Sequence, residues 1–381
     1  MDYTRVLQEF FSQLNGPKFS IKLWDGTEYS YGAGSTTTFT LVIDDVSTVQ
    51  RLLAQGALGF GEAYMEGKLR VEGDLEAYLR LRHQFKHVRR SLRLIIATFL
   101  SSRSVPRDRK DQIAYHYDLG NDFFKMILDH ETMSYSAGRY ERGSESLAEA
   151  QRNKLKLACQ WLKLPQGASV LDLGSGWGGF AQYAAENMQW HITGYTLSNA
   201  QLEYCRKLIK ANHLEKLVSF EYRDMVGDLP GTQFDGIAMI ESIEHVGQKR
   251  LPQFFNQLHK MLKPGGPLVM QLTGRYKPHP VDRWTLKYVF PGGYLPAKEE
   301  LLHAATDAGF LVEEFCDDTQ DYLRTMTEWI RNLERHRKDI ERKFDPPFYR
   351  LWELWMHGAK VAFESNSMNL FRIHFKRAPD L

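Results

Sequence analysis

The chain has 381 residues, of which 43% are hydrophobic and 25% charged, and its formal net charge is +2. This composition is typical of a globular protein, and the length predicts two domains because single cores rarely grow beyond about 250–300 residues. The small net charge does not favour a nucleic-acid partner. No run of eighteen apolar residues occurs, and the first residues lack the basic-then-apolar order of a signal peptide. We therefore expect a cytoplasmic protein without a transmembrane helix.

The three cysteines, Cys159, Cys205 and Cys316, are scattered along the chain. Their spacing fits neither a disulfide framework nor a set of metal ligands. No group of histidine and acidic residues has metal-ligand spacing either, so we expect no metal. The cysteines are predicted to be buried packing residues.

The first hundred residues predict a small α+β domain, with short alternating strands such as residues 39–43 among helical patterns. Four glycines, Gly56, Gly59, Gly61 and Gly67, surround the sequence Ala63-Tyr64-Met65. Tight turns or close approaches of the backbone are expected there, because glycine carries no β-carbon.

Basic residues then dominate from Arg80 to Lys110, a stretch in which Asp108 is the only acid. Within it, residues 92–100 are mostly apolar but too few to cross a bilayer. Such a segment suits the surface of an anionic phospholipid membrane. A solvated helix and linker between two domains explains it equally well. We place the domain boundary at Ser104-Val105-Pro106, giving an N-terminal domain of residues 1–104 with a basic linker and a second domain of residues 105–381.

From Ile113 onward, strands alternate with helices, which predicts an α/β domain with a mostly parallel, Rossmann-like sheet. Ser146-Leu147-Ala148-Glu149 is a capping box that begins a helix reaching about Leu162. Helices are expected between the first five strands, and about fifty residues rich in tryptophan, tyrosine and phenylalanine separate the last two. This helical insert either walls an apolar pocket or adds to the core. The seven strands are predicted at about 168–173, 191–196, 217–222, 234–240, 267–273, 311–316 and 369–376.

A glycine-rich turn follows the first of these strands, in residues 170–180. Gly174, Gly176 and Gly179 fit the G-x-G-x-x-G pattern of dinucleotide sites, which alone is a weak signal. Asp172 before the glycines, Phe234-Asp235 at the fourth strand and residues 262–266 before the fifth are instead typical of methyltransferases. An acid after the second strand commonly binds ribose hydroxyls in both classes. Residues 194–201 contain none, so Thr196 and Gln201 are expected to meet the hydroxyls.

Several motifs carry a more specific resemblance. They are residues 59–67, residues 115–124, Met133-Ser134-Tyr135-Ser136, Ala150-Gln151 with Lys154, Glu244-His245-Val246-Gly247, and Trp284 with residues 287–291. With these motifs the chain resembles bacterial cyclopropane-fatty-acyl-phospholipid synthases nearly end to end, and its C-terminal domain is similar to the mycolic acid cyclopropane synthases. The resemblance implies a class I S-adenosylmethionine-dependent C-methyltransferase fold and an N-terminal domain that binds lipid.

The resemblance also implies a reaction: transfer of a methyl group to the cis double bond of an unsaturated phospholipid acyl chain. Loss of a proton from the new methyl then closes a cyclopropane ring. It further implies a homodimer at the inner face of the cell membrane. By the same resemblance, the cofactor S-adenosylmethionine contacts Tyr135, Ser136, Asp172, Gly174, Gly176, Thr196, Gln201, Arg223 and Asp224.

In the resembling family the base is commonly a bound bicarbonate, held by a cysteine position, a glutamate, a histidine and a tyrosine. Glu244 matches the glutamate and Tyr322 the tyrosine. Ala137 stands at the cysteine position and Gln271 at the histidine position, with Thr273 two residues further on. Glutamine donates to an anion but cannot carry the positive charge of histidine. Three possibilities remain: weaker bicarbonate binding, Glu244 as the base, or a cation quenched otherwise to give a methyl-branched or methylene chain. We predict that the product is a cyclopropane ring. The alternatives are a methyl-branched or methylene acyl chain, or transfer of the methyl group to a small soluble acceptor.

Overall fold

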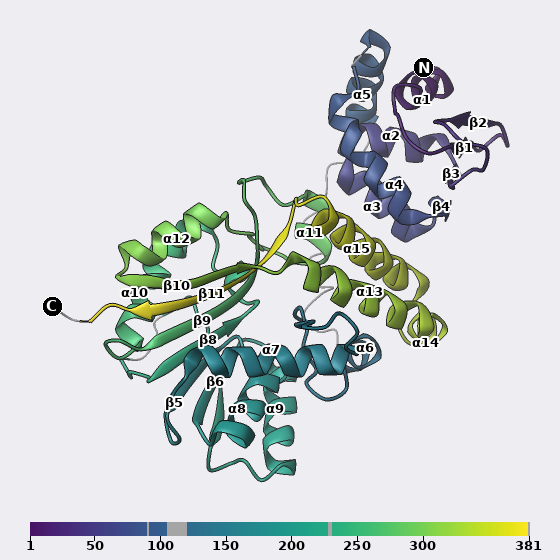
Figure 1. Ribbon diagram of the computed structural model, residues 1–381. Coiled ribbons are helices and arrows are strands. Elements are labelled where there is room, and N and C mark those ends of the chain that lie inside the picture. The colour runs from purple at the N-terminus through teal and green to yellow at the C-terminus, as the bar shows by residue number, and fades with distance from the viewer. Residues whose placement is uncertain (90, 105–119, 228–230, 380–381) are drawn as a thin grey trace. The chain divides into compact units, whose positions relative to one another are not determined.

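The computed structural model describes residues 1–89, 91–104, 120–227 and 231–379 (Figure 1). They form two compact units, the first made of Met1–Tyr115, Asp282–Pro291 and Arg335–Val361, and the second of His116–Val281, Gly292–Glu334 and Ala362–Leu381. The expected domain boundary adjoins residues 105–119, which lie outside the described ranges. Two segments from the C-terminal half of the chain thus group with the N-terminal unit.

The first unit is the predicted small α+β domain. Its sheet has the order β2-β1-β3-β4, in which β1 runs parallel to β3 and the other neighbours are antiparallel. The strands are β1 (Phe19–Lys22), β2 (Glu28–Tyr31), β3 (Phe39–Ile43) and β4 (Leu69–Gly73). The helices are α1 (Tyr3–Phe11), α2 (Val46–Gln55), α3 (Ala57–Glu66), α4 (Leu75–Leu81), η1 (Arg82–His87), α5 (Leu92–Ser104), α11 (Arg283–Tyr288), α14 (Arg337–Lys343) and most of α15 (Pro346–Glu364).

The glycines of this unit behave as their clustering predicts. Gly67 ends α3 in the left-handed conformation, with φ of 75°, which glycine adopts without the steric cost of a β-carbon. Gly61 lies within α3, where a β-carbon would come within 2.1 Å of the Trp284 indole. The absence of a side chain at Gly61 therefore lets α3 and α11 pack closely.

The second unit contains the predicted seven-stranded sheet, in the order β10-β11-β9-β8-β5-β6-β7. The five strands from β9 to β7 are parallel, whereas β11 lies antiparallel between β9 and β10. The strands are β5 (Ser169–Leu173), β6 (His191–Thr196), β7 (Val218–Tyr222), β8 (Gly236–Ile240), β9 (Pro267–Gly274), β10 (Phe310–Asp317) and β11 (Asn369–Arg377).

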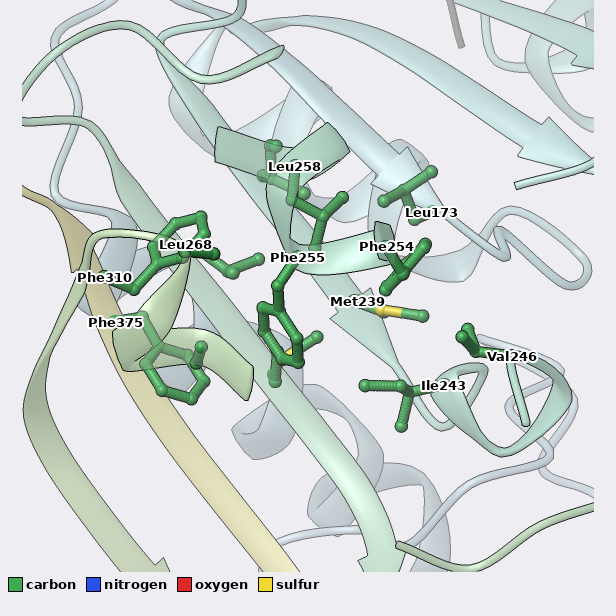
Figure 2. Close-up of a cluster of buried hydrophobic side chains, with 14 of the residues drawn as sticks. Leu173, Met239, Ile243, Val246, Phe254, Phe255, Leu258, Leu268, Phe310 and Phe375 are labelled. Atoms are coloured by element: carbon green, nitrogen blue, oxygen red, sulfur yellow. The ribbon is translucent and has the colours of Figure 1, made fainter. Parts of the chain in front are cut away.

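Helices cover both faces of this sheet, as expected for a parallel sheet that is apolar on both sides. On one face, α7 (Leu147–Leu162), α8 (Gly179–Met188) and α9 (Asn199–Ala211) pack on β5, β6 and β7. On the other, α10 (Leu251–Met261) and α12 (Lys298–Asp307) enclose a cluster that includes Phe254 and Phe255 (Figure 2). The remaining elements of the unit are α6 (Asn121–Ile127), α13 (Thr319–Arg335), η3 (Ile243–His245) and η4 (Gln248–Arg250).

Three details refine or correct the expectations. The Ser146–Glu149 capping box is present, with Glu149 N donating to Ser146 Oγ at 3.3 Å. The prediction of a helix between β7 and β8 is wrong for residues 223–227 and 231–235. These residues form turns and irregular backbone. Cys159 and Cys205 are buried as expected, but Cys316 is only partly buried. Within the described ranges, no helix has the length and apolar character needed to cross a membrane.

The strand order reverses next to β5, which is where this kind of sheet binds ligands. From β5 the chain continues outward through β6 and β7, then returns to place β8 on the other side of β5. Ligands bind beyond the carboxyl ends of the strands at such a switch point. The residues that follow β5 and β8 are therefore the first to examine for a site.

Candidate active site

The turn after β5 is shaped for close approach of a ligand. Gly174 has φ of 80° and Gly176 has φ of 54°, both in the left-handed region. A β-carbon at Gly174 would lie 2.4 Å from Ser242 Cβ, so this glycine is required for packing. At Gly176 an added β-carbon would meet no atom within 4 Å. The backbone there borders open space, which suits contact with a bound cofactor.

Asp172 places a buried carboxyl group beside this turn. Its side chain is 2% exposed, and among the residues that the structure describes its buried Oδ2 has no hydrogen-bond partner. Burial raises the pKa of Asp172 to about 7. A buried carboxyl oxygen without a partner is costly unless a ligand supplies a donor. The amino group of S-adenosylmethionine is such a donor, so Asp172 and the open Gly176 backbone fit this cofactor.

The expected ribose contacts Thr196 and Gln201 lie at the end of β6, the neighbour of β5, and the predicted cofactor contacts Arg223 and Asp224 follow β7, the next strand outward. Thr196 Oγ1 donates to Gln201 Oε1 at 2.9 Å, so the two side chains form one polar pair. Arg223 N donates to Thr196 O at 3.0 Å, while its guanidinium pairs with Glu221. Asp224 Oδ1 accepts from Val226 N at 2.9 Å and so shapes the turn after β7. All four predicted residues thus lie at or just beyond the carboxyl ends of β6 and β7, at the ligand-binding edge of the sheet.

Tyr135, another predicted cofactor contact, is one ring in a row of packed aromatic side chains. Tyr135 stacks on Trp329 with ring centroids 5.1 Å apart, and Trp329 meets Tyr322 edge to face at 6.2 Å. On the other side, Phe124 lies 5.2 Å from Tyr135 and 4.8 Å from Trp177, which follows Gly176. Aromatic faces therefore extend from the glycine turn to Tyr322.

Ser136 is held by a buried polar group from α7. Lys154 Nζ donates to Ser136 Oγ at 2.7 Å and to Gln151 Oε1 at 2.5 Å, and Gln151 Nε2 donates to Ser136 O at 2.7 Å. Burial lowers the pKa of Lys154 to about 8, with the charge of Glu241 acting in the opposite direction. The motif residues Gln151 and Lys154 thereby fix the backbone just before Ala137.

Glu241, which directly follows β8, forms the centre of a hydrogen-bonded cluster. Its Oε1 accepts from Ala137 N at 2.8 Å and from Gln271 Nε2 at 2.7 Å. Its Oε2 accepts from Tyr322 OH at 2.7 Å. Burial, and then the charge of Glu241, raise the pKa of Tyr322 well above its usual value. Three of the five predicted catalytic residues thus converge on a carboxylate that the sequence reasoning did not single out.

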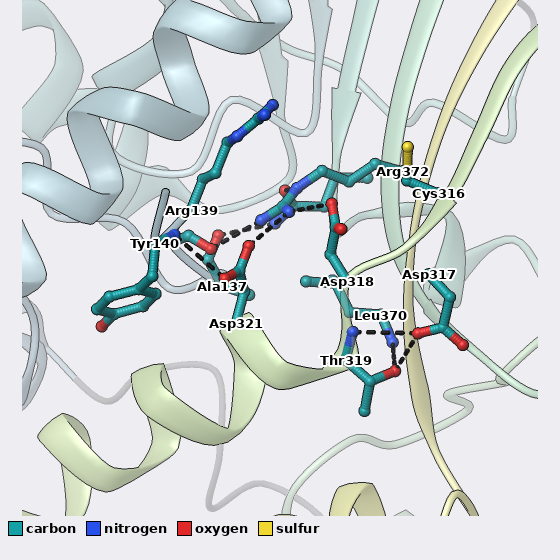
Figure 3. A network of polar contacts seen from close by, with 12 residues as sticks. Ala137, Arg139, Tyr140, Cys316, Asp317, Asp318, Thr319, Asp321, Leu370 and Arg372 are labelled. Atoms are coloured by element: carbon teal, nitrogen blue, oxygen red, sulfur yellow. Dashed lines mark hydrogen bonds and ion pairs between the residues drawn. The ribbon is translucent and has the colours of Figure 1, made fainter. Parts of the chain in front are cut away.

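Arg372 on β11 orients Gln271 in this cluster. Arg372 is 2% exposed, and its Nε donates to Gln271 Oε1 at 2.7 Å. Its Nη1 pairs with both Asp318 and Asp321 (Figure 3), and its Nη2 donates to Gly138 O. Because a guanidinium has only donors, Gln271 must present its oxygen to Arg372. The amide nitrogen is then directed to Glu241 and to Ala137 O, which accepts at 2.9 Å.

Glu244 and Thr273, the other two predicted catalytic residues, form a separate contact beside this cluster. Thr273 N donates to Glu244 Oε1 at 2.6 Å. Within the described ranges, the buried Oε2 of Glu244 has no hydrogen-bond partner. Burial, and then the charge of Glu241, raise the pKa of Glu244 to about 8. At neutral pH Glu244 therefore holds a proton.

The sequence reasoning missed Glu241 and Arg372. A signal for Glu241 was present, because an acid directly after a buried strand lies at the ligand-binding edge of such a sheet. Arg372 was a charge within the apolar run Leu370 to Phe375, and a buried charge requires partners. In the part of the chain that the structure describes, no group of three or more histidine, cysteine or acidic side chains could hold a metal ion.

Comparison with known proteins places this site in a family. The model of the mycolic acid cyclopropane synthetase family matches residues 105–373, and a domain of unknown function matches residues 6–87. A Pseudomonas putida protein described as a probable fatty acid methyltransferase is 30% identical over 93% of this chain and 90% of its own length. The cyclopropane-fatty-acyl-phospholipid synthase of Escherichia coli K12 is 31% identical, over 86% and 85% respectively.

A solved structure shows the same fold. The mycolic acid cyclopropane synthase CmaA1, complexed with SAH and CTAB, is 24% identical, with a TM-score of 0.65 over 71% of this chain and 99% of that one. The family model covers well over half of the chain, and the glycine turn and the Glu241 cluster lie within the matched residues. The chain belongs to the mycolic acid cyclopropane synthetase family and is an S-adenosylmethionine-dependent methyltransferase.

Proposed function

We propose that the protein transfers a one-carbon unit from S-adenosylmethionine to the cis double bond of an unsaturated phospholipid acyl chain and forms a cyclopropane ring. The observation that carries this proposal is the contact of Tyr322 with both a carboxylate and an aromatic row. Tyr322 OH donates to Glu241, while its ring stacks on Phe363 at 4.2 Å and meets Trp329 edge to face.

The reaction makes two demands that this arrangement meets. An alkene is a weak, uncharged nucleophile, and its attack on a methyl group leaves a carbocation. Aromatic faces and negative charge stabilise such a cation. A base must then remove a proton from the new methyl group. The aromatic row and the Glu241 carboxylate supply these groups within the second unit of the chain.

The cofactor supplies an electrophilic methyl group on a sulfonium when bound. Asp172 would hold its amino group, Gly174 and Gly176 would let the backbone approach it, and Thr196 with Gln201 would meet its ribose hydroxyls. Arg223 and Asp224 follow β7 at the same edge of the sheet. The solved relative CmaA1 contains SAH, which supports this assignment.

The acyl substrate is supported by the relatives and by α5. The Escherichia coli relative is a cyclopropane-fatty-acyl-phospholipid synthase. On α5 the side chains of Leu92, Ile95 and Ile96 are 73%, 49% and 43% exposed. Exposed apolar residues on a helix beside basic residues suit the surface of an anionic membrane. We propose that this helix binds the protein peripherally to the inner face of the cell membrane.

The test is incubation of the full chain with methyl-labelled S-adenosylmethionine and vesicles of unsaturated anionic phospholipid. We expect label in the acyl chains and cyclopropane protons in their NMR spectrum. Vesicles with saturated chains are the matched control and should stay unlabelled. Label in soluble amines or hydroxyls without vesicles would contradict the proposal, as would no transfer to any unsaturated phospholipid.

A second product class is a methyl-branched or methylene acyl chain. The Pseudomonas putida relative, described as a probable fatty acid methyltransferase, favours it. A methyl-branched alkene and a cyclopropane are isomers, so mass alone does not separate them. The NMR spectrum of the purified acyl chains decides between the two products.

A further inference from the structure

The carboxylate of Glu241 occupies a place that was expected to hold a different anion. Family resemblance assigns bicarbonate to the cysteine, histidine and tyrosine positions, which here are Ala137, Gln271 and Tyr322, together with Glu244. Donors from the first three all point at Glu241, at 2.7–2.8 Å. All three partners donate, which is the pattern of an ionised carboxylate. The donors expected to hold bicarbonate therefore already have an anion.

A carboxylate resembles bicarbonate in the features that such a site recognises. Both are planar, carry one negative charge and share it between two oxygens on one carbon. Glu241 uses both oxygens, Oε1 toward Ala137 and Gln271 and Oε2 toward Tyr322. A second anion would have to displace it or lie against it, and like charges in a partly buried site repel strongly. The residues present do not fit bicarbonate while Glu241 is in place.

The backbone at Glu241 is in an uncommon conformation that places the side chain there. Its φ is 49°, in the left-handed region that costs free energy for a residue with a β-carbon. Glu241 N donates to Gln271 O at 2.7 Å, so the strained residue is anchored to the strand that carries Gln271. Such strain clusters at functional sites, which favours a functional role for this carboxylate over a packing role.

The replacement of histidine by glutamine agrees with this arrangement. Gln271 Oε1 accepts from Arg372, and Gln271 Nε2 donates to Glu241 and to Ala137 O. Both polar atoms of the Gln271 side chain therefore have hydrogen-bond partners. An amide donates a hydrogen bond but does not titrate. A histidine at this position could itself bind or release a proton and would compete with Glu241 for the proton that Glu241 is to accept. Gln271 therefore holds Glu241 in place and leaves it able to accept a proton from elsewhere.

Glu244 is less suited to the same role. It holds its proton at neutral pH, because burial and the neighbouring Glu241 charge raise its pKa to about 8. One of its oxygens already accepts from Thr273 N. Of the two carboxyl groups, Glu241 is thus the one that contacts Tyr322 in the aromatic row, where a cation would form.

We propose that Glu241 is the general base of the reaction and replaces bicarbonate with a carboxylate that belongs to the chain. This inference rests on the proposed function. The π electrons of the double bond form a bond to the donated methyl carbon, while the electron pair of the broken carbon–sulfur bond stays on sulfur. Glu241 then takes one proton from that methyl carbon. The electron pair of the broken C–H bond closes the ring, and the proton later passes from Glu241 to water.

The first measurement is the rate on unsaturated phospholipid vesicles in buffer freed of carbon dioxide, with and without added bicarbonate. The wild-type rate should change by less than about twofold, whereas Glu241→Gln should lose on the order of 100-fold, the usual contribution of a general base. In Glu241→Gly, which vacates the carboxylate position, bicarbonate or formate should restore the rate by about tenfold or more. The exposed Glu215→Gln is the matched control and should keep the wild-type rate.

The second measurement separates this inference from the proposed function, because it requires no turnover. Carbon-13 bicarbonate is titrated onto each protein, and bound anion is detected by difference infrared spectroscopy. Wild type should show no bound bicarbonate and Glu241→Gly should show it, with S-adenosylhomocysteine affinity within about twofold of wild type as evidence of folding. If no phospholipid is turned over but this pattern holds, the substrate assignment fails and the anion replacement stands.

Bicarbonate bound by the wild type would overturn the inference, and so would a Glu241→Gln rate close to wild type. The products of Glu241→Gln give a further readout that a purely structural role would not move. Without the base, the cation loses its proton to other acceptors, and the fraction of methyl-branched alkene should rise relative to cyclopropane. An unchanged product ratio in a slowed variant would assign Glu241 a structural role instead.

Discussion

Arg372 Nε donates to Gln271 Oε1 at 2.7 Å, although the two residues are 101 positions apart in the chain. They lie opposite each other on the antiparallel strands β9 and β11. This contact decides which end of the Gln271 amide faces Glu241, because Arg372 accepts no hydrogen bond. A buried arginine thus determines the chemistry of the site without touching Glu241.

The first prediction tests this orientation with Gln271→Met, which keeps the length of the side chain and removes its polar atoms. Arg372 Nε and Ala137 O each lose a buried partner, so the free energy of unfolding should fall by about 1–3 kcal/mol. The rate should fall by about tenfold, because Glu241 loses one of its three donors. Urea unfolding and initial rates measure the two effects. The exposed Gln253→Met is the control, and equal losses in both variants would contradict the assignment.

How far the sequence predicts this molecule depends on how local each feature is. The glycine turn, the capping box of α7 and the seven strands are set by residues close together in the chain, and all are found where local patterns place them. The segments 282–291 and 335–361 were assigned to the second domain but group with the first unit. That grouping depends on contacts such as Tyr64 OH to Glu353, which join residues 289 positions apart.

The same reason explains what was missed in the site. The apolar pattern of β8 ends at Ile240, and the position of Glu241 directly after it indicates the ligand-binding edge of the sheet but not which groups the carboxylate contacts. Glu241 becomes significant only when Ala137, Gln271 and Tyr322 converge on it, from 30 to 104 positions away. Because Glu244 matches the family motif, the sequence predicted Glu244 as the catalytic carboxylate. In the structure it is Glu241 that contacts Ala137, Gln271 and Tyr322.

The second prediction concerns the phenol of Tyr322. Tyr322→Phe keeps the ring against Phe363 and Trp329 but removes the donor to Glu241 Oε2. We expect the rate to fall by about tenfold and the free energy of unfolding by about 1.5–3 kcal/mol, the usual contribution of a hydrogen bond to a charged group. Kinetics on phospholipid vesicles should show a lower kcat with an almost unchanged KM, because the ring surface remains.

Tyr276→Phe is a matched control for this variant. Tyr276 OH also donates to a carboxylate, Asp317 Oδ2 at 2.8 Å, but its side chain is 46% exposed. This variant should keep kcat within about twofold of wild type and lose little stability, since exposed interactions contribute about 0–1 kcal/mol. If both variants lose kcat equally, the effect of Tyr322→Phe does not come from the Glu241 contact.

The third prediction follows from the raised pKa of Asp172, about 7 in the folded protein without ligand. The folded state keeps this proton after the unfolded state has lost it near pH 4, so this contribution to stability is complete below about pH 4. It is lost as the pH rises toward 7. Asp172→Asn, which does not titrate, should therefore gain stability relative to wild type between pH 5 and 8, by up to about 4 kcal/mol.

Urea unfolding of both proteins at several pH values measures this difference. The exposed Asp307→Asn reports the effect of removing an aspartate charge elsewhere on the surface. A difference between Asp172→Asn and wild type that stays constant from pH 5 to pH 8 would show that burial does not hold the proton on Asp172.

The last prediction concerns membrane binding by α5. Ile95 and Ile96 are about half exposed, and transfer of one such side chain into the acyl region contributes roughly 1 kcal/mol. Ile95→Ser with Ile96→Ser should therefore weaken binding to anionic phospholipid vesicles by about tenfold or more, as measured by sedimentation. Leu311→Ser with Val312→Ser removes comparably exposed apolar side chains from β10 and should bind like wild type. Equal loss in both double variants would show that general surface hydrophobicity, and not α5, binds the membrane.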